Sequence, residues 1–172
     1  MSSNNPNLPE PWLRGTLCDV PAVPRAVLHA LVLAQEDLRN WCYALTEDQL
    51  NATPGRLASV AFQLRHIARS LDRLLTYAEG SSLSEAQVAQ LKSEADPTAQ
   101  HDELFAELET GLKRSEERVR MLASVDLEMP RGVGKKMLPT TVGGLLVHIA
   151  DHTQRHVGQA IVTAKIVAGS HR

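Results

Sequence analysis

Three histidines stand four residues apart in the C-terminal part of the chain: His148, His152 and His156. Residues four apart are neighbours on a helix surface, with Cβ atoms ~5–6 Å from each other. Two neutral imidazoles placed in this way can bind one divalent ion, through bonds of ~2.0–2.1 Å in the case of zinc. Such an ion can lower the pKa of a bound water or thiol and so provide a nucleophile near neutral pH.

The phase of the expected helix favours one pair of these histidines. At ~100° per residue, the apolar stripe of residues 142–167 has its centre close to His156, and His152 lies ~60° from that centre. His148 lies about 100° away, on the flank of the helix. Imidazoles that face a core need polar partners there, and a metal ion satisfies both. We therefore predict that His152 and His156 bind a metal. The alternative is that they are surface or hydrogen-bonded core residues.

Two better-known metal motifs are absent from the sequence. The HExxH motif of zinc proteases is missing, because Ile149 and Thr153 stand where its glutamate would be. The ExxH pair of di-iron bundles does not occur either. We therefore expect a mononuclear site that is based on histidine.

The candidates for a third ligand are His29, His66 and His101. His66 lies in the middle of a predicted helix, ~120° from its apolar centre. Gln63, Ser70 and Arg73 share that flank and are expected to form polar contacts around the site. His29 lies next to an apolar stripe, as a core histidine or a neighbour of the site. His101 is expected to be exposed in the first turn of its helix.

Four segments carry apolar residues every three or four positions, which predicts helices that bury one face. They are residues 23–45, 57–78, 101–123 and a segment that starts after Pro139, with Thr140 or Thr141 as its N-cap, and ends near residue 167. Residues 84–91 predict a short helix, and residues 129–136 a turn-rich loop. No segment shows useful strand alternation. We predict an all-α four-helix bundle at residues 21–168, with a long crossover connection after the second helix and no β-sheet. Residues 1–20 are predicted to form a flexible arm.

The composition narrows the classes of function. The chain has 172 residues, a net charge of −2 and 3% aromatic residues, which argues against a nucleic-acid partner. Its two cysteines, Cys18 and Cys42, form no metal-binding or disulfide pattern and suit a reducing compartment. The longest uncharged stretch, residues 137–150, is too short to span a membrane. We expect a cytoplasmic protein without a membrane segment.

Two segments resemble those of a known family. Residues 140–159, with His152-Thr-Gln-Arg-His156-Val-Gly-Gln, are similar to the last bundle helix of the DinB-like (DNA-damage-inducible) superfamily, and the segment around His66 is similar to the one that carries its first ligand. The resemblance implies a bundle with a long crossover and a divalent metal, zinc or nickel, held by His66, His152 and His156. One departure is Val157, where many members carry arginine, so a contact made by that arginine is not expected here.

The resemblance also implies two classes of function. Some members of the family are thiol-dependent S-transferases or isomerases, so one expectation is a metal-dependent transferase or hydrolase that acts on a small molecule, with a low-molecular-weight thiol as a candidate substrate. Asp151, His29 and His148 are then the candidate general bases. The other expectation is a non-catalytic, metal-braced module for interaction or sensing. In both cases the resemblance, together with the abundance of two-fold assemblies, implies a homodimer.

Overall fold

The computed structural model describes residues 8–96 and 98–169, and all structural statements below concern these residues. Residues 1–7 of the predicted arm lie outside them. Residues 8–20 include a short 3-10 helix, η1 (Pro11–Leu13), and follow the outside of the first long helix. Arg14 forms two hydrogen bonds with the carboxylate of Glu36, at 2.7 and 2.8 Å, and Val20 is buried.

Four long helices form the body of the molecule, as the apolar periodicity predicts. They are α1 (Ala22–Cys42), α3 (Val60–Ala78), α5 (His101–Leu122) and α6 (Val142–Gly169). Two short helices, α2 (Glu47–Asn51) and α4 (Glu85–Lys92), and a second 3-10 turn, η2 (Pro54–Arg56), lie in the connections. Four helices are capped at their N-termini by hydroxyl side chains, which accept hydrogen bonds from N–H groups of the first turn. The capping residues are Thr46, Ser59, Ser84 and Thr141.

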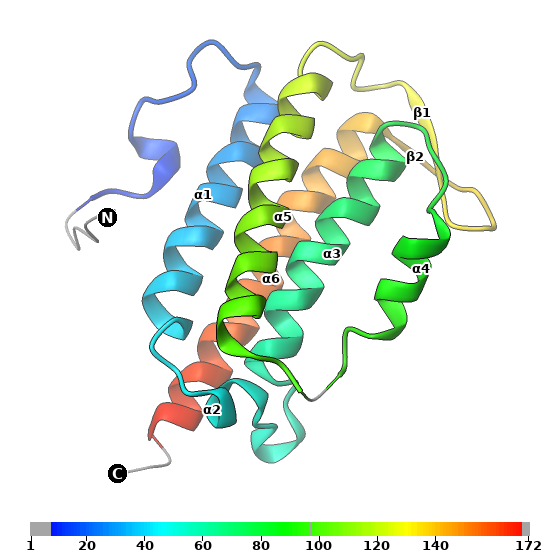
Figure 1. The fold of residues 1–172 in the computed structure, drawn as a ribbon. Helices are drawn as coiled ribbons and strands as arrows, with labels where there is room; N and C mark the ends of the chain where they lie inside the picture. Colours follow the sequence, from blue (N-terminus) through cyan, green and yellow to red (C-terminus); the bar gives the residue numbers. More distant parts are fainter. Residues whose placement is uncertain (1–7, 97, 170–172) are drawn as a thin grey trace.

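The four long helices enclose one apolar core (Figure 1). α1 and α3 each pack against both α5 and α6, so the core lies between the four helices. Leu38, Leu64, Leu71, Leu146 and Ile149 are fully buried there. Burial of a side chain of this size contributes about 1.5–3 kcal/mol relative to leaving it exposed, which is why the apolar faces set the arrangement of the helices.

The connection between α3 and α5, described at residues 79–96 and 98–100, runs the length of the bundle and contains α4 (Figure 1). As a result α3 and α5 run in the same direction, whereas α1 and α6 run in the opposite one. This confirms the predicted all-α bundle with a long crossover after the second helix. We refer to residues 79–96 and 98–100 as the crossover.

The connection between α5 and α6 differs from the prediction. Strands β1 (Pro130–Val133) and β2 (Leu138–Thr141) pair antiparallel, so the predicted turn-rich loop is a β-hairpin and the expectation of no β-sheet is wrong here. Each strand has only four residues, which is too short to show alternation in the sequence. The turn between them uses a positive φ of 70° at Gly134, a conformation that glycine adopts without steric cost.

Among the described helices, none has both the length and the apolar character that crossing a membrane requires.

Candidate metal centre

Three histidines from two helices meet at one side of the bundle. His66 comes from the middle of α3, and His152 and His156 come from successive turns of α6. One ring nitrogen of each lies within 4.8 Å of one ring nitrogen of the other two, and all three residues are half-buried. The ring centroids are 5.1 Å apart for His66 and His152, 4.2 Å for His66 and His156, and 4.5 Å for His152 and His156. The structure therefore brings together His152 and His156, which the helix phase predicts, and His66, which the family resemblance implies.

His66 is oriented from its far side by a buried carboxylate. Its Nδ1 lies 2.7 Å from Oε2 of Glu94, whose side chain is only 5% exposed. The other carboxylate oxygen of Glu94 accepts a hydrogen bond of 2.6 Å from Arg73. An Nδ1–H that donates to Glu94 leaves Nε2 of His66 with a free lone pair, which is the form that binds a metal. In addition, the ring of Phe62 stacks on the imidazole, with centroids 5.4 Å apart.

His156 is oriented in the same way by an amide. Its Nδ1 lies 2.6 Å from Oε1 of Gln63 on α3, and Nε2 of Gln63 donates to Oε1 of Gln159 on α6 at 3.0 Å. Gln63 is 1% exposed, so its amide is fixed by these two bonds and by packing. Nε2 of His156 is thereby left as the free nitrogen.

His152 lacks such a partner. Its Nδ1 is buried without a hydrogen bond in the part of the chain that the structure describes, and its Nε2 lies 3.4 Å from Nε2 of His66. A buried polar atom without a partner costs about 1–3 kcal/mol. The described side chains alone therefore leave the hydrogen-bonding capacity of this cluster incomplete.

The electrostatics of the cluster favour neutral imidazoles. Burial, together with the charge that His156 and His66 would carry when protonated, lowers the pKa of His152 to about 4. Burial, together with the charge that His66 would carry when protonated and the charge of Arg155, lowers the pKa of His156 to about 4. Burial alone would raise the pKa of Glu94, but hydrogen bonds from His66 and Arg73 hold this pKa below its usual value. Two of the three imidazoles are therefore neutral at pH 7 and able to bind a metal without first losing a proton.

The three side chains fit a divalent metal. Two bonds of ~2.1 Å at a tetrahedral angle would place their nitrogens ~3.4 Å apart, and the Nε2 atoms of His66 and His152 are 3.4 Å apart. Neutral nitrogen donors suit zinc, nickel and other late first-row metals. The outer hydrogen bonds to Glu94 and Gln63 are of the kind that orients metal-binding histidines in proteins.

The other histidines that the structure describes lie outside this cluster. His29 is buried and contacts Oγ1 of Thr16 at 3.2 Å. The ring of His148 is exposed and lies 5.3 Å from that of His152. The expectation of an exposed His101 is wrong, because Nε2 contacts the carbonyl of Tyr43 at 2.8 Å and its side chain is 21% exposed.

The polar contacts around the site agree with the sequence only in part. Gln63 contacts His156, and Arg73 reaches the site through Glu94, as the shared flank of α3 predicts. Ser70 instead donates to the carbonyl of Ile67 in its own helix. Glu94 was missed, because it lies in the crossover, 28 residues from His66, and nothing in the surrounding residues marks it as buried.

Comparison with models of known protein families matches residues 30–160 of this chain to the DinB superfamily. The chain belongs to the DinB superfamily. The match spans all of α3 and α5 and includes His66, His152 and His156 of the candidate centre. No curated protein gave a significant match.

Proposed function

We propose that this DinB-superfamily protein binds one divalent metal ion, zinc or nickel, through His66, His152 and His156 and uses it as a metal-dependent enzyme. The observation that carries the proposal is the set of three converging ring nitrogens within 4.8 Å of one another. Two of the rings are already oriented by hydrogen bonds from their far nitrogens. Catalytic zinc sites characteristically have three protein ligands and keep a further position open, whereas structural sites are closed by a fourth.

When bound, the ion would supply Lewis acidity, which allows a water molecule or a thiol to ionise near neutral pH. The residues of the chain have separate tasks. His66, His152 and His156 hold the ion, while Glu94 and Gln63 keep two of these rings in the binding tautomer. This division supports a transferase that activates a low-molecular-weight thiol, or a hydrolase that activates water.

His148 is the candidate to exchange protons with solvent. It is exposed on α6, one turn before His152, and their rings are 5.3 Å apart. The two other candidate bases have different partners. Asp151 forms an exposed ion pair with Arg155 at 2.7 Å, and the ring of His29 contacts Thr16.

The test of this proposal is turnover by the metal-loaded protein. The wild-type chain, loaded with zinc or with nickel, is incubated with a panel of small thiols and electrophiles and with activated esters. A His152→Ala variant whose helical circular dichroism matches that of the wild type serves as the matched control, because it lacks one proposed ligand. We expect product formation by the loaded wild type above the rate of the variant. Equal rates for both proteins across the panel would contradict an enzymatic role.

A second candidate function is a non-catalytic module that the metal braces. It is favoured by the origin of the ligands, since His66 on α3 and the pair on α6 would join two helices of the bundle. Cobalt(II) distinguishes the two candidates, because its visible absorption responds to added ligands. A spectrum that changes when a small thiol is added supports an open site and the enzyme, whereas an unchanged spectrum supports the brace.

We also propose that the protein is a homodimer. Val147 and Val162 on α6 are 59% and 54% exposed, which leaves apolar surface that a second copy could cover. Static light scattering at micromolar concentration should give twice the mass of one chain. The mass of a single chain at all concentrations would contradict the proposal.

A further inference from the structure

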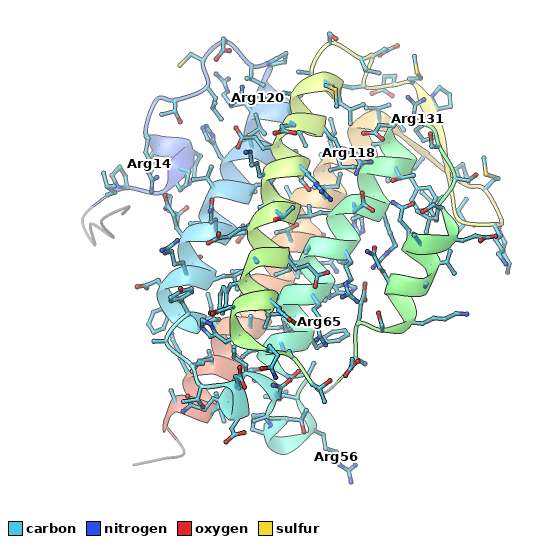
Figure 2. All side chains as sticks on the ribbon, in the orientation of Figure 1. Arg14, Arg56, Arg65, Arg118, Arg120 and Arg131 are labelled. Atoms are coloured by element: carbon cyan, nitrogen blue, oxygen red, sulfur yellow. The ribbon has the colours of Figure 1, made fainter. Side chains whose placement is uncertain are left out.

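The crossover is fastened to α3 by a row of arginines. Arg65, Arg69 and Arg73 stand four residues apart, so their side chains lie on one face of the helix. Arg65, labelled in Figure 2, donates to the carbonyl of Asp96 at 2.6 Å. Arg69 donates to the carbonyl of Gln90 at 3.1 Å and to Oγ of Ser93 at 2.9 Å, and it also pairs with Glu107 of α5.

Arg73 differs from the other two arginines, because its partner in the crossover touches the metal centre. It is 8% exposed and donates to Oε1 of Glu94, while Oε2 of the same carboxylate contacts Nδ1 of His66. Both oxygens of Glu94 are thus used for orientation. Because its carboxylate is buried and lies between His66 and Arg73, Glu94 acts on the site through His66, as a positioning group.

We propose that Glu94, held by Arg73, positions His66 for metal binding and thereby couples occupancy of the centre to docking of the crossover. This inference rests on the metal binding proposed above and adds the residue pair that controls it. An ion on Nε2 of His66 requires the proton to be on Nδ1, and that proton is the one that Glu94 accepts. Binding of the ion and docking of Glu94 therefore favour the same state of the ring. By thermodynamic linkage, binding of the ion makes docking of the crossover more favourable, and docking raises the affinity for the ion.

The chain offers a matched control for this role. Glu107 pairs with Arg69 at 2.6 Å, and Arg69 holds the same crossover without contacting any of the three histidines. A Glu107→Gln variant thus loosens Arg69, which holds the crossover, without a change next to a histidine. Glu94→Gln instead leaves one acceptor oxygen for two donors, Nδ1–H of His66 and the guanidinium of Arg73. If Glu94 only held the crossover in place, its replacement would change the zinc affinity no more than the replacement of Glu107.

The experiment measures zinc affinity by competition with a chromophoric chelator, for the full-length wild type, Glu94→Gln and Glu107→Gln. Glu94→Gln should lower the affinity about 10–100-fold, and Glu107→Gln should remain within about threefold of the wild type. An unchanged affinity in Glu94→Gln, or an equal loss in both variants, would overturn the inference while leaving the proposed function intact. Failure of the wild type to bind either zinc or nickel would overturn the proposed function, and the inference with it.

Hydrogen exchange on the wild type keeps the inference testable if Glu94→Gln does not fold. The backbone amides of residues 85–96 are followed with and without zinc. Zinc should slow their exchange at least fivefold more than it slows that of α2, which lies outside the crossover. Exchange that zinc leaves unchanged in the crossover would overturn the coupling.

Discussion

Nδ1 of His156 lies 2.6 Å from Oε1 of Gln63, so the face of α6 that carries His152 and His156 is joined to α3 by a hydrogen bond between two residues 93 positions apart. The amide of Gln63 is completed by Gln159, which lies one turn after His156 on α6. This arrangement fixes both the rotation and the tautomer of the His156 ring.

Replacing Gln63 by leucine tests this relationship. Gln63→Leu keeps the buried volume and removes the acceptor of the His156 proton, so zinc affinity should fall about 10–100-fold. The control is Gln159→Leu, at an exposed position that contacts Gln63 but not the histidines, with an expected loss of less than about threefold. Competition with a chelator measures both. Affinities in the reverse order would show that Gln63 does not orient His156.

The stability of the metal-free protein should depend on pH. Burial lowers the pKa of His152 and of His156 to about 4, whereas an unfolded chain has histidines near ~6.5. Between these values the unfolded state binds more protons, so the free energy of unfolding falls as the pH decreases. The contribution is complete above about pH 6.5 and is lost progressively towards pH 4.

Urea unfolding of the metal-free protein at a series of pH values measures this dependence. A His152→Gln/His156→Gln double variant should lose less stability between about pH 6.5 and 4 than the wild type. Other groups, Glu94 among them, keep part of the slope in both proteins. Parallel curves for the two proteins would contradict the lowered pKa values.

Substitutions at two glycines in helices are expected to change the free energy of unfolding in opposite directions. A Cβ at Gly158 on α6 would meet no atom within 4 Å, so Gly158→Ala should stabilise the protein by about 0.5–1 kcal/mol through helix propensity. A Cβ at Gly111 on α5 would lie 3.2 Å from Cα of Ala68, where α3 and α5 approach closely. Gly111→Leu should therefore destabilise the protein by about 1–3 kcal/mol. Urea unfolding measures both, and a stabilised Gly111→Leu would contradict the close approach.

The sequence predicts those elements of the fold that are marked by a periodic pattern of apolar residues. Apolar residues at every third or fourth position locate α1, α3, α5 and α6, because burial of such a face determines both the helix and its orientation. The phase of α6 also separates His152 and His156 from His148, which the structure leaves exposed. The hairpin was missed because strands of four residues are too short for a period to show.

The contacts that complete the centre depend on tertiary structure. His66 lies on the flank of α3, and periodicity gives no reason to prefer it over His29; its selection came from family resemblance. Glu94 is buried only because the crossover folds back onto Arg73 and His66. A charged residue in a polar connection is usually solvated, so the local sequence predicts the opposite environment.

The metal content of single histidine variants tests the central claim most directly. The wild type and five single variants are loaded with zinc, freed of excess metal and submitted to elemental analysis. The variants are His66→Ala, His152→Ala, His156→Ala, His148→Ala and His101→Ala. We predict close to one zinc per chain in the wild type, His148→Ala and His101→Ala, and loss of most of the metal in the three others. Loss in His148→Ala with retention in His156→Ala, or full occupancy in His66→Ala, would contradict this assignment of the centre.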